Sequence, residues 1–141
     1  MNEKLAKYIK AGNYADYVSE RYLEVADYEE LVFTNEDFSN VDWRKFPSSM
    51  NVFINCKLDG LILSSGQPIR IEGCSAKGLD ISGVTAIIHA SESDFTGMKY
   101  NSETMLADST DPSNIPSTFD KCIFDKETQE YFTMQGVVFK N

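Results

Sequence analysis

The chain has 141 residues, with 22 acidic side chains against 13 basic ones and a formal net charge of -9. This excess excludes the usual kind of nucleic-acid-binding protein, which needs a basic face to displace counterions from phosphates. Hydrophobic residues make up 42% of the sequence. A chain of this length suits one domain, which buries roughly two thirds of its unfolded surface, so we expect a single folded domain over residues 1–141.

Residues 1–30 are predicted to form an N-terminal helical cap. Apolar side chains recur at helical spacing before and after Gly12, which predicts two short amphipathic helices joined by a turn. Neither this segment nor any later window is long and apolar enough to be a signal peptide or a membrane span. We therefore expect a cytoplasmic protein with no membrane partner.

From residue 31 onward, apolar residues recur every five positions. A period of five fits neither a helix, with about 3.6 residues per turn, nor a flat strand, with a repeat of about two. It fits a chain that turns a corner every five residues. The centres of this repeat are Phe33, Phe38, Trp43, Ser48, Phe53, Leu58, Leu63, Ile71, Ala76, Ile81, Ala86, Phe95, Tyr100, Met105, Phe119 and Phe124.

Small polar residues, which suit turns, separate the apolar centres, as in EDFSN, CKLDG, LDISG, SDFTG and STFDK. This pattern resembles the pentapeptide-repeat family over about residues 31–126. The resemblance implies a short right-handed quadrilateral β-helix, here of about four coils, with the central residue of each repeat pointing inward. Residues 127–141 are predicted to cap its far end.

Four repeats per coil predict which centres stack on one another. The predicted stacks are Phe33, Phe53, Ala76 and Tyr100; Phe38, Leu58, Ile81 and Met105; Trp43, Leu63, Ala86 and Phe119; and Ser48, Ile71, Phe95 and Phe124. Two short insertions, one at 66–68 and one at 89–92, would then project from one edge, one above the other. They are either candidate binding elements or loop growth without a function. Their candidate residues are Gln67, Pro68, His89 and Glu92.

A longer interruption at 108–116 is predicted to be a surface loop. Cys56, Cys74 and Cys122 form no CxxC motif or Cys/His cluster, and we expect them to be reduced and buried. The only histidine, His89, falls in a predicted loop, and no nucleotide-binding, metalloprotease or hydrolase motif is present. We therefore predict no catalytic, cofactor or metal site and expect a protein that is not an enzyme.

Residues 20–42 hold eight acidic side chains and one basic side chain, and so contain a net charge of -7. This concentration is either a solvated, solubilising helix end or an anionic patch that docks on a cationic groove. The candidate partner-binding residues are Glu20, Glu24, Asp27, Glu29, Glu30, Glu36, Asp37 and Asp42.

Pentapeptide-repeat proteins include rods that resemble duplex DNA and occupy the DNA groove of topoisomerases. That resemblance favours a non-catalytic inhibitor, of the phage or mobile-element type, whose partner is a basic or nucleic-acid-binding protein rather than nucleic acid itself. The alternative is a structural or assembly module that joins other chains, or pairs two copies of itself, through the terminal segments. An enzyme is the third hypothesis.

Overall fold

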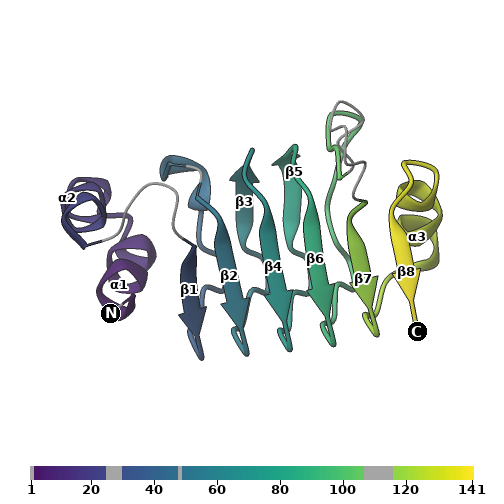
Figure 1. Cartoon of the computed structure of the whole chain (residues 1–141), viewed down its shortest axis with the longest axis horizontal. Helices are drawn as coiled ribbons and strands as arrows, with labels where there is room; N and C mark the ends of the chain where they lie inside the picture. The colour runs from purple at the N-terminus through teal and green to yellow at the C-terminus, as the bar shows by residue number, and fades with distance from the viewer. Residues whose placement is uncertain (1, 25–29, 48, 107–115) are drawn as a thin grey trace.

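Parallel strands stacked in register form most of the structure, a computed structural model that describes residues 2–24, 30–47, 49–106 and 116–141. The chain winds as a β-solenoid of about five turns, with helices at its N-terminal end and one more near its C-terminus (Figure 1). The predicted fold class, a mainly β helix with terminal capping segments, is confirmed. The number of coils is about five instead of about four. Among the described residues, no helix is long and apolar enough to cross a membrane.

Two helices lie at the N-terminal end, as predicted. Helix α1 spans Glu3–Ala11 and α2 spans Tyr14–Glu24. Gly12 ends α1 in the left-handed conformation, with φ 69°, which costs glycine little. Leu5 and Ile9 of α1 are buried in the same core cluster as the first strand. Helix α1 therefore covers the open end of the first turn, which would otherwise expose apolar side chains.

Two parallel sheets carry the turns. The first side of the solenoid is a six-stranded sheet of β1 (Leu31–Thr34), β2 (Asn51–Ile54), β4 (Ile69–Glu72), β6 (Ile88–Ser91), β7 (Thr118–Asp120) and β8 (Val138–Lys140). The other sheet pairs β3 (Ile62–Ser65) with β5 (Asp80–Val84), and a short 3-10 helix, η1, spans Trp43–Lys45. Single bridges continue the second side at Asp37, Lys57, Ser75, Asp94 and Ile123.

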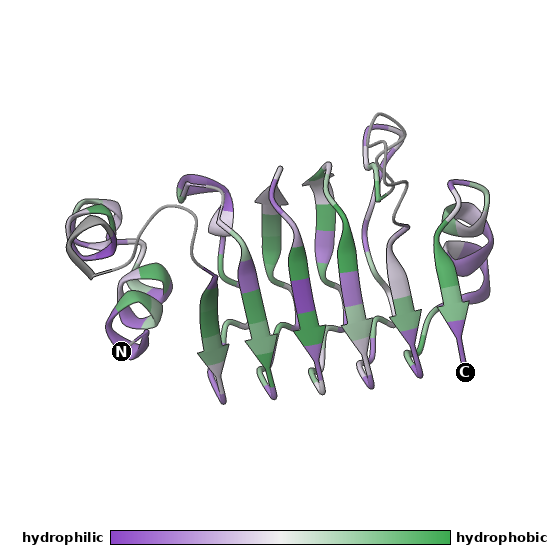
Figure 2. Cartoon of the chain, viewed as in Figure 1, coloured by the Kyte–Doolittle hydropathy of each residue, from purple (hydrophilic) through white to green (hydrophobic). Residues whose placement is uncertain are grey.

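Alternation along the strands decides which side chains form the core. In β4, Ile69 and Ile71 are fully buried, whereas Arg70 is exposed and Glu72 is partly exposed. Figure 2 shows apolar and polar bands along the strands of this side. The strand register then gives the inward stack of the first side as Phe33, Phe53, Ile71, Ala90, Phe119 and Phe139. The second side stacks Phe38, Leu58, Ala76, Phe95 and Phe124, and the third Trp43, Leu63, Ile81 and Tyr100.

In the first two coils, the predicted stacks of the first three sides are right. The fourth stack is wrong, because Ile71 lies on the first side of the third coil, and Ser48 lies outside the described residues. From the third coil onward all the predicted stacks are wrong. Leu31 pairs with Asn51, 20 residues further on, but Val52 pairs with Arg70, only 18 residues further on. The segment predicted as an insertion at 66–68 is part of a shortened fourth side. Ser65 tightens this corner, since its Oγ contacts both the N–H and the carbonyl oxygen of Gln67 at 3.0 Å. Every later residue therefore moves to a different side.

The second predicted insertion is also wrong, because His89 belongs to β6. His89 pairs with Arg70 of β4 on one side and with Thr118 of β7 on the other. Gln67 and Pro68 are exposed in the turn before β4, and Glu92 is exposed in the turn after β6. The four candidate residues therefore do not project from one edge, one above the other.

Met105 is not an inward centre, as the repeat predicted. Its side chain is 42% exposed, whereas Thr104 and Leu106 on either side of it are fully buried. Most of the loop predicted at 108–116 lies outside the described residues.

The corners between sides explain the small polar residues of the repeat. Asn40, Gly60, Gly78 and Gly97 occupy equivalent corners of successive coils, and all adopt positive φ between 59° and 73°. Only glycine and, less readily, asparagine tolerate this conformation at low cost. The pattern that predicted the fold is thus a pattern of corners as much as of core residues.

The three cysteines share one position of the coil, which Ser93 occupies in the coil between Cys74 and Cys122. Cys56 and Cys74 are buried and unpaired, as predicted, and Cys122 is only half-buried, which corrects its expected burial. The Cys56 N–H lies 3.4 Å from Cys74 Sγ, and the Cys74 N–H donates to Ser93 Oγ at 3.0 Å. These small side chains therefore satisfy backbone groups at the corner before the second side.

The C-terminal segment closes the other end. Helix α3 (Lys126–Thr133) buries Phe132, and β8 then pairs in register with β7, which adds the fifth turn. Gln135 bonds to the last described residues of the fourth side: its Nε2 donates to Thr104 O at 2.9 Å, and its Oε1 accepts from Leu106 N at 3.1 Å. This side chain supplies hydrogen bonds that a further coil would have made.

The observed register predicts opposite results for two neighbouring residues. Leu106→Ala should lower the free energy of unfolding by about 2–5 kcal/mol, since it leaves a cavity in the core. Met105→Ala should change it by less than about 0.5 kcal/mol, because Met105 is a surface residue. Urea unfolding followed by circular dichroism measures both. A larger effect for Met105→Ala would contradict the register and restore the inward position that the repeat predicted.

Candidate interaction surface

The acidic residues predicted to bind a partner are partly neutralised by the helices beside them. Glu20 lies 3.3 Å from Lys4 Nζ, and Glu36 lies 2.7 Å from Lys10 Nζ. Residues 2–24 contain four acidic and four basic side chains, so the N-terminal helices add no net charge. Since α1 brings its lysines onto these carboxylates, the anionic end predicted from residues 20–42 alone is weaker than expected.

Two further candidates are also ion-paired. The Arg44 guanidinium donates two hydrogen bonds of 2.9 Å to the Asp42 carboxylate. Hydrogen bonding from Arg44 lowers the pKa of Asp42 to about 2. Glu30 lies 3.7 Å from Arg70, which also contacts Glu72 at 3.0 Å. The side chain of Glu24, and all of Asp27 and Glu29, lie outside the described residues.

Four carboxylates line the second side of the solenoid, at Asp37, Asp59, Asp94 and Asp125, and we call them the carboxylate row. Each is next to an inward centre of the second side, so its own side chain points outward. Only Asp37 was a predicted partner-binding residue. The signal for the others was the aspartate beside the apolar centre in CKLDG, SDFTG and CIFDK, which the sequence alone explains by turn formation.

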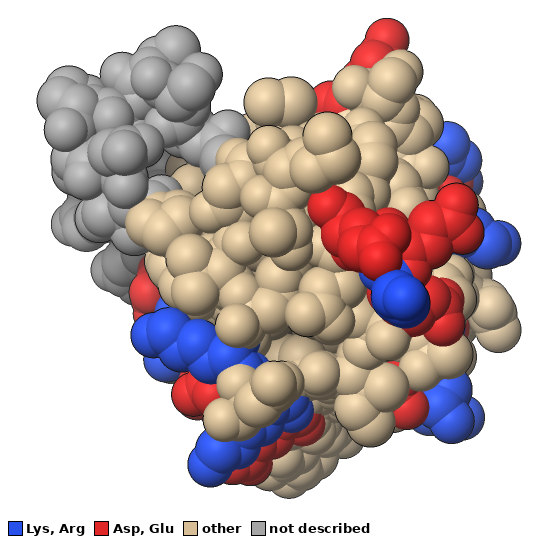
Figure 3. Space-filling view, turned by 90° about the vertical axis from the view of Figure 1, so that its right-hand side faces the viewer, with Lys and Arg blue, Asp and Glu red and all other residues tan. Residues whose placement is uncertain are grey.

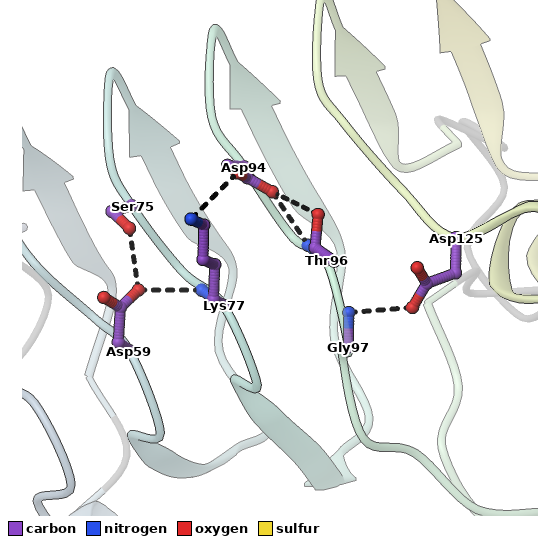
Figure 4. Close-up of polar contacts among 7 residues, drawn as sticks. All are labelled: Asp59, Ser75, Lys77, Asp94, Thr96, Gly97 and Asp125. Carbon is purple, nitrogen blue, oxygen red and sulfur yellow. Dashed lines mark hydrogen bonds and ion pairs between the residues drawn. The ribbon is translucent and has the colours of Figure 1, made fainter.

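Hydrogen bonds hold each carboxylate of the row in place. Asp59 Oδ1 accepts from the Ser75 hydroxyl at 2.7 Å and from the Lys77 N–H at 2.8 Å, which ties it to the next coil (Figure 4). Asp94 Oδ1 accepts from the N–H and the hydroxyl of Thr96, at 3.0 and 2.6 Å (Figure 4).

The two remaining carboxylates are fixed by backbone donors. Asp125 Oδ2 accepts from the Gly97 N–H at 2.8 Å, and Asp37 Oδ1 accepts from the Ser39 N–H at 2.9 Å. Donors of this kind favour the ionised carboxylate. Hydrogen bonding from Thr96 lowers the pKa of Asp94, and hydrogen bonding from Ser39 lowers that of Asp37. The row therefore presents charges at fixed positions.

Two lysines lie among the carboxylates of the row, so that positive and negative charges are mixed along it. Lys57 and Lys77 lie on the same side of the solenoid, and Lys77 Nζ is 3.9 Å from Asp94 Oδ2 (Figure 4). The second side thus carries four acids and two bases. It is a mildly anionic strip in which negative charge dominates toward both ends.

The first side carries a shallow hollow around His89, which the sequence predicted to lie in a loop. The hollow has a volume of about 230 Å³, and it is lined by Arg70, Glu72, His89, Ala90, Ser91, Thr118 and Asp120. His89 Nδ1 lies 2.8 Å from Thr118 Oγ1. Burial, and then the charge of Arg70, lower the pKa of His89, which favours the neutral imidazole. Within the described part of the chain, no three His, Cys, Asp or Glu side chains are grouped to hold a metal ion.

The C-terminal end exposes apolar side chains. Met134 is 89% exposed, Ile123 58% and Val138 37%. Figure 3 shows this end as a largely uncharged surface, with an acidic cluster around one basic side chain right of its centre and mixed charges at its lower left. This is the surface on which the alternative hypothesis, assembly through a terminal segment, depends.

No protein-family model, curated protein or solved structure matches the chain. The resemblance to pentapeptide-repeat proteins therefore stays a prediction from the residue pattern. The function has to be argued from the surfaces described above.

Removing one donor should raise the pKa of a carboxylate in the row. Wild-type Asp94 should titrate below its ordinary value of 3.8, and Thr96→Val should move this pKa upward because the hydroxyl is lost and the N–H stays. Asp94 then stabilises the fold above about pH 4, and this contribution fades as the pH falls through its lowered pKa. Carbon-detected NMR titration of the side-chain carboxyls measures the pKa of Asp94 in the wild type and in Thr96→Val. Asp42, held near pKa 2 by Arg44, should not move and is the internal control. An ordinary pKa for Asp94 in the wild type would refute the claim that hydrogen bonds from Thr96 hold this carboxylate in place.

Proposed function

We propose that this chain is a non-catalytic interaction protein that binds and inhibits a basic, nucleic-acid-handling protein, as phage or mobile-element inhibitors do. The observation that carries the proposal is the carboxylate row, in which hydrogen bonds fix four outward charges along one side of a rigid solenoid. Fixed side chains lose little conformational entropy on binding. Complementary charge speeds encounter with a cationic groove and sets its register.

The geometry favours a short anionic strip over a copy of duplex DNA. Successive coils are separated by about 4.8 Å, whereas duplex DNA carries one negative charge per about 1.7 Å of its axis. Lys57 and Lys77 dilute the row further. We therefore propose a partner whose groove matches this pattern of acids and lysines, and a DNA-mimic role limited to the charge pattern.

A cytoplasmic location is part of the proposal. The three cysteines, Cys56, Cys74 and Cys122, are all unpaired, which suits a reducing compartment.

The second candidate function is an assembly module, favoured by the exposed Met134, Ile123 and Val138. Exposed apolar side chains that gather at one end of a protein can mark an interface between proteins. Two copies, or another chain, would then meet at the C-terminal end.

Neutralising the row without changing its shape tests the first function. The variant Asp37→Asn, Asp59→Asn, Asp94→Asn and Asp125→Asn keeps the acceptor oxygens and removes four charges. Wild-type protein on a resin should retain a protein from nucleic-acid-depleted lysate, and the purified captured protein should bind the variant at least about tenfold more weakly. Binding of the captured protein to the wild type should weaken steeply between about 0.05 and 0.2 M salt, and duplex DNA should displace the captured protein. Equal affinity for the variant, or binding that ignores salt and DNA, would refute the proposal.

The assembly function makes a different prediction. Sedimentation equilibrium should then give a multiple of the 15.9 kDa chain mass for the wild type. Met134→Asp should return the mass to that of one chain, since a charge opposes burial in an interface. Tyr14→Asp, at a 50% exposed residue of α2, is the matched control. A wild-type monomer at all concentrations would contradict assembly through copies of this chain.

A further inference from the structure

One edge of the six-stranded sheet is open along β1. Leu31 N donates to Met50 O at 2.9 Å and Asn35 N to Ile54 O at 3.0 Å, so alternate residues of this segment face β2. The backbone groups of Val32 and Thr34 point the other way, toward the N-terminal helices. Strands β2, β4, β6 and β7 have a neighbour on both edges, whereas β1 has only one neighbour among the strands that the structure describes.

A side-chain amide already occupies one group of this edge. Asn2 Nδ2 donates to Val32 O at 2.6 Å, in the way that the N–H of an added strand would. No described residue pairs with the Val32 N–H or with the N–H and carbonyl oxygen of Thr34. The amide of Asn2 makes no cap hydrogen bond to α1, so its bond to β1 is not needed to start the helix.

A groove of about 260 Å³ lies beside these open groups. It is lined by Asn2, Glu3, Val32, Phe33, Thr34 and Glu36. Val32 is 38% exposed and offers an apolar contact. Glu36 pairs with Lys10 at 2.7 Å, and no ion pair joins Glu3 to another described residue. The groove therefore combines unpaired strand groups with an acidic rim.

We propose that this groove binds an extended peptide segment of a partner protein, which adds as a strand along β1 and places a basic side chain against Glu3. Strand addition takes its affinity from backbone hydrogen bonds and its specificity from side chains at alternate positions. The basic character of the segment rests on the proposed function, while the strand addition itself does not. Asn2 leaves Val32 O when the segment binds.

Short capped peptides of alternating Lys and Val are the direct probe. Binding is followed by ¹⁵N–¹H NMR, and the expected result is saturable shifts at the amides of Val32 and Thr34. The same peptide with Glu for Lys should bind at least about tenfold more weakly. N-methylation of alternate amides in the Lys peptide should abolish binding, because it removes the donors that pair with β1. Binding that survives methylation on both alternate sets overturns the proposal.

Variants of the edge separate it from the carboxylate row. Thr34→Pro removes an outward N–H and no ladder bond, and it should weaken Lys-peptide binding about fivefold to tenfold, as expected for one lost hydrogen bond. Thr34→Ala keeps the N–H and is the matched control, with little loss expected. Asn2→Ala frees Val32 O and should tighten binding, a gain that does not depend on whether the proline variant folds.

The outcomes distinguish this inference from the proposed function. Loss of peptide binding in the four-Asn variant of the row, with Thr34→Pro and Asn2→Ala unchanged, overturns strand addition and leaves the proposed function standing. If Thr34→Pro weakens and Asn2→Ala tightens peptide binding while the four-Asn variant leaves it unchanged, strand addition is supported, even if the row binds nothing. Self-association that Thr34→Pro abolishes, without any peptide binding, would assign the edge to a second copy of the chain and overturn the proposal.

Discussion

Stacking of each coil on the next is the interaction on which the rest of the structure depends. The same in-register placement gives backbone groups their hydrogen-bond partners and puts Phe33 on Phe53, with ring centroids 5.9 Å apart. Phe38, Trp43 and Phe53 pack edge-to-face inside the first two turns. Because each coil stacks its inward residues on those of the coil before it, a change in the length of one coil shifts every stack that follows it.

Corners are the second requirement, and they bring the charges to the surface in rows. A chain that turns every few residues needs left-handed corners, such as Asn40 and Gly60, and side chains that satisfy the turn backbone. Asp59 and Asp94 meet that need with carboxylates. One set of hydrogen bonds therefore shapes the coil and fixes outward charges, and the carboxylate row is a by-product of folding that a partner can use.

The ends are where stacking stops, and each end is treated differently. Helix α1 covers the first turn with Leu5 and Ile9 but leaves part of the β1 edge unpaired. At the other end, Gln135 bonds to the backbone of Thr104 and Leu106, while Met134 stays exposed. Open strand edges and exposed apolar residues are sites where other chains can join a sheet, so the surfaces best suited to partners lie at the ends and along the fixed carboxylates.

The sequence by itself determined the solenoid, the N-terminal helices and, in the first two coils, the stacks of the first three sides, because the five-residue pattern of core and corner residues is local. It did not determine the later register, since Ser65 and Gln67 close a shortened side whose length no local pattern reveals. Nor did it determine the electrostatics. The acidic stretch at 20–42 is partly neutralised by Lys4 and Lys10. Only the tertiary structure decided this, because charges distant in sequence meet once the helix packs on the first coil.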